Sequence, residues 1–284
     1  MQVATAIADV RSAVAEARAG GAQIGFVPTM GALHAGHLSL VERSRLECDV
    51  TVMSIFVNPL QFGPAEDLSR YPRPVEDDER LARDSSVDIL FRPDVSDMYP
   101  GDRTITVTAG SLGAAWEGAS RPGHFDGVLT VVAKLFNIVA PDVAVFGRKD
   151  LQQAALVTAM VRDLDMALSV IVAPIVREDD GLALSSRNRY LGDQDRRRAL
   201  ALSTALEASR KAFSRGERSV AALEAEGRGV LEMHAGVDTD YFAIVDPRTF
   251  ERSSSAEPHH AGIVAARVGS TRLIDNMTLG RDKD

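Results

Sequence analysis

The sequence has 284 residues, of which 45% are hydrophobic and 25% are charged, so it can form one large domain and a smaller one with separate cores. Its formal net charge of -8 argues against non-specific binding to nucleic acid, which requires a basic surface. Cys48 is the only cysteine and no run of about 18 apolar residues occurs, so internal disulfides and thiolate metal sites are excluded, no membrane span is expected, and a cytoplasmic location is favoured.

Short β-rich runs alternate with apolar residues at helical spacing over the first part of the chain. This alternation predicts an α/β domain with a Rossmann-like, doubly wound parallel sheet. Pro28 is expected to end the first of these strands, because proline lacks the N–H that a strand ladder uses. The expected strands are 24–27, 50–57, 87–91, 143–146 and 168–173, and the expected helices are one that starts near residue 7 and stops at Gly20, then 37–47, 128–139 and 151–164.

After Pro174 the pattern changes to two long helical stretches, at about 195–214 and 220–234, followed by three β-like runs. This change predicts a smaller C-terminal α+β domain, with the boundary between residues 1–174 and 175–284. In open parallel sheets ligands bind beyond the carboxyl ends of the strands. The loops that follow Val27, Val57 and Phe146 are therefore the candidate functional segments.

Two histidines stand in the first of these loops, which reads PTMGALHAGH over residues 28–37. Glycines let backbone amides approach a ligand, a helix N-terminus carries partial positive charge, and imidazoles donate hydrogen bonds to phosphate oxygens. From the residues alone, His34 and His37 are equally compatible with an anion site and with a helix cap beside a surface residue. Nothing in the spacing supplies a third metal ligand near the pair.

Three further segments allow a functional and a purely structural interpretation. Asn58–Phe62 follows the second expected strand and could form a simple turn or point amides into a cleft. Residues 147–150, with Lys149, could bind a phosphate, or Asp150 could only compensate a helix dipole. Residues 184–187, with Arg187, suit a charged ligand but also read as a helix cap and a solvated charge. The acidic run 76–79 reads as a solvated start of a helix.

Five ordered blocks, PTMGALHAGHLSLV, SIFVNPLQF, RPGHFDGVLTVV, FGRKDLQQ and VREDDGLALSSRNRYL, resemble the successive motifs of the pantothenate synthetases. These enzymes belong to the nucleotidyltransferase superfamily, which carries a His-x-Gly-His signature. The resemblance runs from about residue 25 to 191 and resumes at GSTRLIDN, residues 269–276. The sequence departs from the family at Ala35, where an acidic residue is frequent, at Arg148, where Glu is usual, and at Leu151, where an aromatic is common. Because Arg148 stands next to Lys149, the expected affinity for ATP is less secure than the expected type of reaction.

The resemblance implies that ATP activates (R)-pantoate as pantoyl-adenylate, which then reacts with β-alanine to give pantothenate and AMP, with pyrophosphate released in the first step. It implies ATP as substrate, Mg²⁺ as cofactor with unknown protein ligands, a homodimer, and a second domain that closes over the ATP site. The catalytic groups of this chain would then be His34, His37 as proton donor, Lys149 and Arg187. Pantoate would be bound by Gln61 and Gln153, and β-alanine by Gln61. Its ATP contacts would be Met30, Gly31, Ala32, Leu33, His34, Ala35, Gly36, His37, Gly147, Arg148, Lys149, Asp150, Val176, Leu184, Ser185, Ser186 and Arg187.

Two rival functions remain at this point. One is a nucleotidyltransferase that adenylylates a different small substrate, and it would need extra cations where this chain has Gln61 and Gln153. The other is a nucleotide-binding regulatory protein that has lost catalysis, which the retained histidines, Lys149 and Arg187 make the weaker reading. AMP formation that depends on both pantoate and β-alanine separates the three.

Overall fold

The computed structural model describes residues 1–64, 66–102 and 104–280. The chain divides into two compact units, and each is described here by itself. The first unit contains Met1–Arg148 and Gln153–Pro174, and the second contains Lys149–Gln152 and Ile175–Asp284. The main division therefore falls between Pro174 and Ile175, where the sequence pattern changes, but the short segment that contains Lys149 groups with the second unit.

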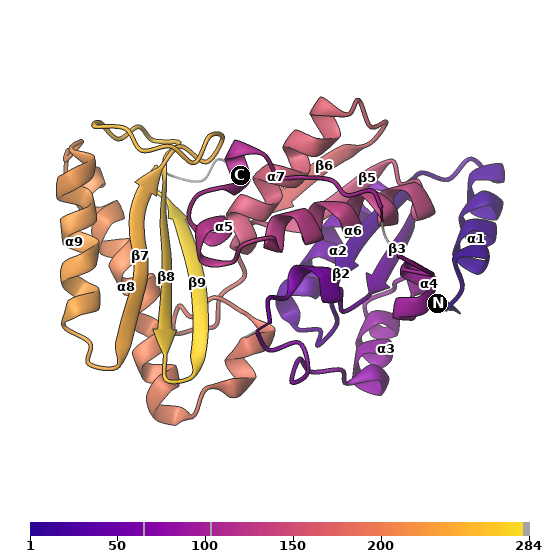
Figure 1. Ribbon diagram of the computed structural model, residues 1–284, viewed down its shortest axis with the longest axis horizontal. Coiled ribbons are helices and arrows are strands. Elements are labelled where there is room, and N and C mark those ends of the chain that lie inside the picture. The colour runs from indigo at the N-terminus through magenta and orange to yellow at the C-terminus, as the bar shows by residue number, and fades with distance from the viewer. Residues whose placement is uncertain (65, 103, 281–284) are drawn as a thin grey trace. The chain divides into compact units, whose positions relative to one another are not determined.

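A six-stranded parallel sheet forms the centre of the first unit (Figure 1). Its strand order is β1-β4-β3-β2-β5-β6, which confirms the predicted doubly wound, Rossmann-like sheet. The order reverses between β2 and β5, so the loops that leave these two strands flank the point where such sheets bind ligands. The strands are β1 (Gln2–Ala4), β2 (Ile24–Thr29), β3 (Val50–Ile55), β4 (Ile89–Phe91), β5 (Val143–Gly147) and β6 (Ser169–Ala173).

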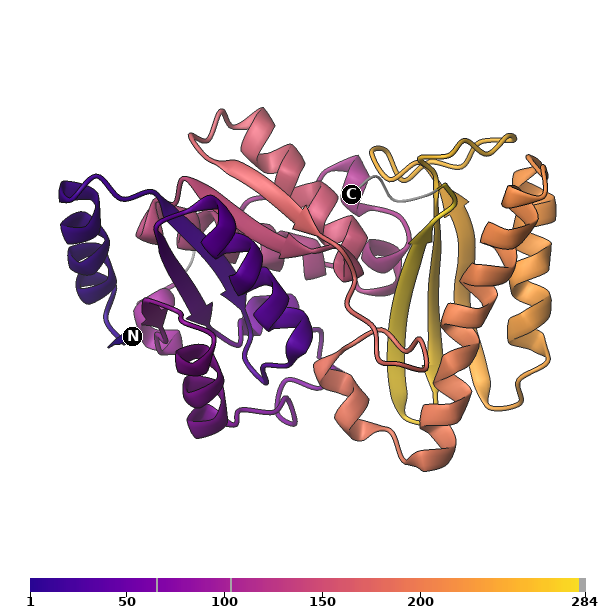
Figure 2. The same ribbon diagram turned by 180° about the vertical axis from the view of Figure 1, so that it is seen from behind.

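Helices cover both faces of this sheet, because alternate strand residues point to opposite sides. Ile24 and Phe26 of β2 pack in a cluster with α1, α6 and α7, whereas Val27 packs in a cluster with α2 and α3. In Figure 1 α6 crosses the near side of the sheet, and in Figure 2 α2 does so. The helices of four or more residues in this unit are α1 (Ile7–Ala19), α2 (Ala35–Glu47), α3 (Val75–Asp84), α4 (Val95–Met98), α5 (Glu117–Ser120), α6 (His124–Val139) and α7 (Leu151–Asp163), the first two residues of α7 being grouped with the second unit.

The prediction that Pro28 ends its strand is wrong, because β2 continues to Thr29. β5 pairs with β2 only at Gly25 and Phe26, so β2 has an unpaired side at Pro28, where a missing N–H costs little. β1 was not predicted, and of α3 only the start, at the acidic run 76–79, was predicted. β1 has three residues, too few for a recognisable alternation, and α3 is highly charged.

The second unit is a three-stranded antiparallel sheet, in the order β7-β8-β9, with two long helices packed against it. This agrees with the predicted α+β composition. The strands extend beyond the β-like runs expected at residues 241–245, 263–268 and 271–274, through residues that are mostly polar or small and so gave no β signal. Their bounds are β7 (Val237–Val245), β8 (Ala261–Val268) and β9 (Thr271–Thr278), and the helices are α8 (Asp193–Ser214) and α9 (Val220–Glu232).

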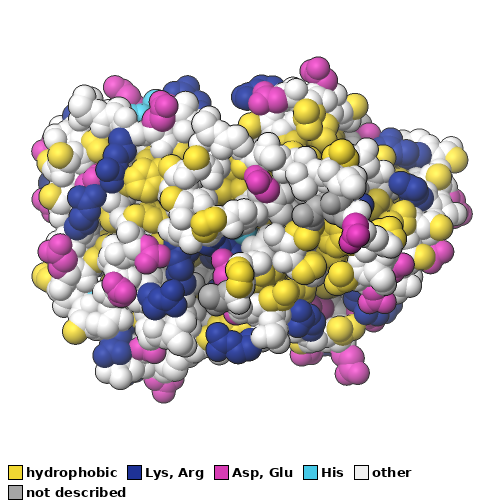
Figure 3. Space-filling model, in the orientation of Figure 1, with side chains coloured by type: hydrophobic (Ala, Val, Ile, Leu, Met, Phe, Trp, Pro, Cys, Tyr) yellow, Lys and Arg dark blue, Asp and Glu magenta, His cyan; other side chains and the backbone are white. Residues whose placement is uncertain are grey.

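On the face drawn in Figure 3, Lys and Arg side chains are interspersed with Asp and Glu side chains. Among the described residues, no helix is both long enough and apolar enough to cross a membrane.

Candidate active site

His34 and His37 lie together where the loop after β2 enters α2. Their ring centroids are 4.1 Å apart, and His34 is the N-cap residue of α2. The Gly36 N–H donates to His34 Nδ1 over 3.2 Å, so Nδ1 is an acceptor and a neutral His34 carries its proton on Nε2. The two interpretations of the sequence are therefore compatible: His34 caps the helix with one ring nitrogen and carries an N–H donor on the other.

The buried carboxylate of Asp78, on α3, holds this histidine loop in shape. Asp78 is 2% exposed, and its two oxygens accept the N–H groups of Ala32 at 2.8 Å and Leu33 at 2.7 Å. For Asp78 the expectation of a solvated acidic run is wrong, although Glu76 and Asp77 beside it are exposed. These two loop amides, which the sequence suggested for a phosphate, donate to a carboxylate of the protein itself.

Gly31 is needed at its position for two local reasons. Its φ is +80°, in the left-handed region that side chains disfavour. A Cβ there would lie 2.8 Å from Asp78 Oδ2 and 2.9 Å from Ile55 Cγ2. The glycine therefore allows the close approach of a carboxylate of this chain, in addition to any approach of a ligand.

The side-chain amide of Gln61 has a defined orientation, which follows from backbone groups around Asn58. Asn58 Nδ2 donates to the Gly127 carbonyl at 3.1 Å, and Asn58 Oδ1 accepts the Leu60 N–H at 3.3 Å. Neither backbone group can change its role, so the Asn58 amide cannot be turned over. Asn58 Nδ2 also donates to Gln61 Oε1 at 3.0 Å, and Asn58 Oδ1 accepts the Tyr99 hydroxyl at 2.8 Å. The Gln61 oxygen is thus used internally, and its NH₂ group is the end that can donate to a ligand.

The Gln61 amide and the histidine loop touch each other. Gln61 Nε2 lies 3.1 Å from Met30 Sδ, and Met30 directly follows β2. The contact is a consequence of the sheet order, because β2 and β3 are parallel neighbours in register from Ile24 to Thr29, and their loops leave the same edge. The first unit therefore brings the Gln61 amide against Met30, the first residue after β2 in the loop that leads to the two histidines.

In the second unit, the turn that contains Lys149 is fixed by the LIDN segment of β9. Asn276 Nδ2 donates to the Lys149 carbonyl at 2.9 Å. Lys149 Nζ lies 3.9 Å from the half-exposed carboxylate of Asp150, a weak ion pair that leaves the ammonium available to an anion. Gly147 ends β5 and Arg148 starts the 3₁₀ turn Arg148–Asp150.

The segment that contains Val176 and Leu184 is a tight hairpin. The Leu184 N–H donates to the Val176 carbonyl at 3.0 Å, so these two predicted ATP contacts are adjacent. Arg177 closes the hairpin onto β9 through two hydrogen bonds to Asp275, at 2.7 and 2.9 Å. Burial raises the pKa of Asp275, although Arg177 opposes the shift. The paired arginine compensates a carboxylate that would otherwise be costly to bury.

Residues 185–187 form the start of a 3₁₀ helix, Ser186–Tyr190, that follows this hairpin. Ser185 Oγ accepts the Arg187 N–H at 3.3 Å, which is the cap that the sequence suggested as the structural alternative. Ser186 is buried and Arg187 is partly exposed. The cap uses the Arg187 backbone and leaves its guanidinium to other contacts.

The two glutamines near the start of α7 have different environments. Gln152 is 5% exposed, whereas Gln153 is partly exposed, about 100° around the helix from its neighbour. Of the two side chains, Gln153 is therefore the more accessible one.

Asp78 and Asn58 are the site residues that sequence reasoning missed. Asn58 lies inside the quoted NPLQF block, so its position was visible but its partner Gly127 was not. Asp78 stands in a run of acids, and nothing in the run distinguishes the buried one. Only the three-dimensional fold identifies these contacts, because each joins segments that are far apart in the chain.

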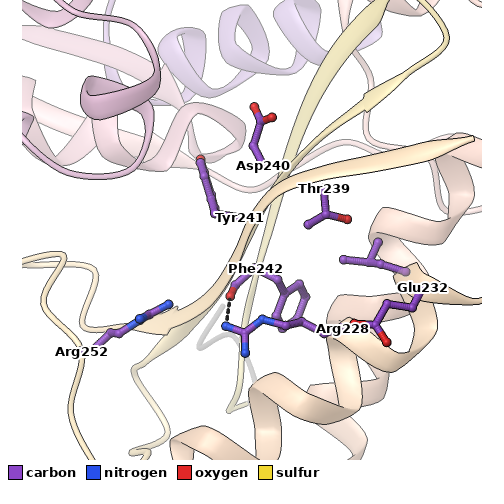
Figure 4. A pocket seen from close by; sticks show the side chains of 8 residues that line it. Arg228, Glu232, Thr239, Asp240, Tyr241, Phe242 and Arg252 are labelled. Atoms are coloured by element: carbon purple, nitrogen blue, oxygen red, sulfur yellow. Dashed lines mark hydrogen bonds between the residues drawn. The ribbon is translucent and has the colours of Figure 1, made fainter.

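A separate hollow of about 360 Å³ in the second unit contains none of the predicted residues (Figure 4). Its two arginines share one buried carboxylate, since Glu224 lies 2.6 Å from Arg228 and 3.4 Å from Arg252. Arg228 also donates to the Phe242 carbonyl at 2.8 Å. These contacts make the arginines part of the packing of α9 on β7. The lining residues are Arg228, Leu231, Glu232, Thr239, Asp240, Tyr241, Phe242 and Arg252.

Asp246, His259 and His260, also in the second unit, place possible metal-ligand atoms within 4.8 Å of one another. Arg248 occupies this cluster, because it donates to both Asp246 oxygens, at 3.0 and 2.6 Å, and lies 3.0 Å from His259 Nε2. These hydrogen bonds hold the pKa of Asp246 below its usual range. A guanidinium already balances the carboxylate, so the cluster is an ion-paired turn.

Comparisons with known proteins agree with the fold and with the family resemblance. The family model described as Pantoate-beta-alanine ligase matches residues 2–278. A pantothenate synthetase of Acidobacterium capsulatum is 51% identical, covering 99% of this chain and 97% of its own. The crystal structure of pantothenate synthetase from Thermus thermophilus is 48% identical with a TM-score of 0.95, covering 99% of this chain and all of its own. That of the ligase from Francisella tularensis, complexed with β-γ ATP and β-alanine, is 33% identical with a TM-score of 0.80, covering 98% of both chains.

Proposed function

The chain belongs to the pantoate-β-alanine ligase family, and we infer that it is the enzyme that condenses (R)-pantoate with β-alanine at the expense of ATP. The products are pantothenate, AMP and pyrophosphate, and the intermediate is pantoyl-adenylate. The family model and the relatives, which cover nearly the whole chain, favour this function over the two rival readings, adenylylation of another substrate and a non-catalytic regulator.

We propose that the first half-reaction needs no general base, because the pantoate carboxylate is ionised at neutral pH. A carboxylate oxygen bonds to the α-phosphorus of ATP while the bond to pyrophosphate breaks. His34, His37, Lys149 and Arg187 stabilise the developing negative charge, and His37 donates a proton to the leaving group. The Nε2–H that the helix cap imposes on His34 supports its part in this proposal.

In the second half-reaction the free amine of β-alanine attacks the carbonyl carbon of the mixed anhydride. The C–N bond forms, the bond to the AMP oxygen breaks, and the amine loses a proton. The anhydride must be kept from water until the amine arrives. We propose that residues 184–187 close over it, as a lid that the hairpin at Val176 anchors.

The observation that supports the substrate assignment is the orientation of the Gln61 amide, whose oxygen is bound by Asn58 and whose NH₂ lies beside Met30. A donor at this place suits the carboxylate and hydroxyl oxygens of pantoate, and the carboxylate of β-alanine, better than it suits a cationic group. We propose that Gln61 binds both substrates and that Gln153 binds pantoate. We also propose that the predicted ATP residues, from Met30 to His37, from Gly147 to Asp150, Val176, and from Leu184 to Arg187, contact the nucleotide.

The proposed Mg²⁺ would accompany ATP and supply charge neutralisation at its phosphates. Within the described part of the chain, no set of three carboxylate or histidine ligands gathers in the predicted ATP loops. This fits an ion that is held by the nucleotide, by water and by at most one or two protein groups.

The test is AMP release with purified protein. AMP should form only when pantoate, β-alanine and ATP are all present, and Gln61→Leu should raise KM for pantoate with little change in KM for ATP. AMP formation without pantoate, from another acceptor, would support the first rival. A folded, ATP-binding protein that forms no AMP under any of these conditions would support the second.

We further propose a cytoplasmic homodimer, as the family resemblance implies. Light scattering on the purified chain tests the dimer, and a molar mass equal to one chain at micromolar concentration would contradict it.

A further inference from the structure

The RPGHFDG block, residues 121–127, has no part in the function proposed above. In the structure its residues converge on the peptide group of Gln61. His124 Nδ1 lies 2.8 Å from the Gln61 carbonyl oxygen, and Arg121 Nη2 donates to the same oxygen at 3.3 Å. A Cβ on Gly127 would lie 2.3 Å from the Leu60 carbonyl oxygen and 2.8 Å from the Gln61 nitrogen, so this glycine lets α6 lie directly on that backbone.

The neighbours of His124 define its tautomer. A carbonyl oxygen can only accept, so Nδ1 must carry the proton. Arg121 Nη1, which can only donate, lies 3.0 Å from Nε2, so Nε2 must be the acceptor. Burial and the Arg121 charge together lower the pKa of His124 to about 4, so the ring is neutral at physiological pH. His124 is therefore a fixed donor to Gln61.

Arg121 is held in turn by Glu66. Arg121 Nε and Nη2 donate to the two Glu66 oxygens, each at 2.7 Å, in a bidentate pair. Burial alone would raise the pKa of Glu66, but the hydrogen bonds and charge of Arg121 outweigh it and hold that pKa below its usual value. The Glu66 carboxylate balances the Arg121 guanidinium, so the side chains that hold the Gln61 carbonyl, Arg121 with Glu66 and the neutral His124, carry no net charge together.

We propose that Arg121 and His124 are positioning residues that clamp the Gln61 carbonyl and thereby aim the Gln61 side chain at its substrates. Asn58 orients the amide at one end of the residue, and the clamp fixes the backbone at the other. The proposal rests on the proposed function, in which Gln61 binds pantoate and β-alanine. It assigns to the RPGH segment an effect on these two substrates and not on ATP.

A matched pair of variants tests the clamp. Asn places an N–H donor near the position of Nδ1, and Leu has a similar size without a donor, so His124→Asn and His124→Leu differ mainly in the bond to Gln61. His124→Leu should raise KM for pantoate and for β-alanine by about tenfold, the equivalent of one hydrogen bond, and KM for ATP by less than about twofold. His124→Asn should restore both values to within about threefold of the wild type.

A second variant covers the case in which His124→Leu does not fold. Arg121→Lys removes the bidentate geometry and should raise the same two KM values in the same direction. The clamp is overturned if folded His124→Leu or Arg121→Lys has unchanged KM values, if Asn and Leu behave alike, or if KM for ATP rises in parallel. Wild-type protein that forms AMP without pantoate would instead overturn the proposed function, which the wild-type assay detects independently of the variants.

Discussion

Removing the buried carboxylate of Asp78 tests whether the shape of the histidine loop matters for stability and for ATP binding. Asp78→Asn keeps the size of the side chain but has one acceptor oxygen where the loop needs two. Either the Ala32 or the Leu33 N–H then faces an NH₂ group. Asp78→Ala leaves both N–H groups without this acceptor.

The magnitude follows from the cost of a buried donor without a partner, about 1–3 kcal/mol for each. Asp78→Asn should therefore lower the free energy of unfolding by about 1–3 kcal/mol, and Asp78→Ala by about 2–6 kcal/mol. Because the loop also carries His34, Asp78→Asn should raise KM for ATP by about tenfold as the loop loses its fixed shape.

Urea denaturation followed by circular dichroism measures the first effect, and initial rates at varied ATP measure the second. Asp77→Asn is the matched control, since Asp77 is exposed on the same helix and pairs with Arg80 at 3.4 Å. That control should change the unfolding free energy by less than about 0.5 kcal/mol. If Asp78→Asn and Asp77→Asn gave the same unfolding curves and the same KM for ATP, the anchoring role of Asp78 would be refuted.

Three further outcomes are expected. His37→Ala should lower turnover by about 10²- to 10³-fold with little change in the urea midpoint, and unaltered pyrophosphate release would exclude its catalytic role. Gly127→Ala should destabilise the protein by about 1–3 kcal/mol, because a Cβ there meets backbone atoms. Gly229→Ala is the control, at a helical position where a Cβ has nothing within 4 Å, and it should stabilise the protein by about 0.5–1 kcal/mol. Equal effects of the two variants would contradict the packing of α6 on the Leu60–Gln61 backbone. His124 binds its proton less readily when folded, with a pKa of about 4 against 6.5, beside Arg121, Glu66 and Glu117. As pH falls from 6.5 to 4 the unfolded chain takes up the proton first, so His124 contributes a loss of about 3 kcal/mol of stability, and urea titrations should show that His124→Asn lacks this contribution.

The parallel sheet could be predicted because its strands are short, apolar and separated by helices with clear spacing. Prediction failed where local pattern carries no signal. Pro28 stays in β2 because β5 pairs elsewhere on that strand, which depends on tertiary pairing. Only the start of α3 was recognised, at the acidic run 76–79, since its sequence VEDDERLARD contains few apolar residues.

The histidine pair could be found in the sequence because both residues lie within one turn of a helix start. Contacts between distant segments could not. Asp78 reaches Leu33 across 45 residues, and Asn58 reaches Gly127 across 69. Such pairs are set by the order of strands, so motif spacing identifies the residues near the ligand but not the residues that hold them.

The fixed orientation of the Gln61 amide has a consequence for inhibitor chemistry. Asn58 commits the amide oxygen, so a designed compound meets only N–H at this position. A sulfonamide or carboxylate oxygen placed there would gain a hydrogen bond, whereas an amine or amidine would set donor against donor. The affinities of compounds that differ only in this group should therefore increase with the acceptor strength of the group. In a protein with Asn58 replaced, the Gln61 amide could turn over, and the affinities of the same compounds should no longer follow that order.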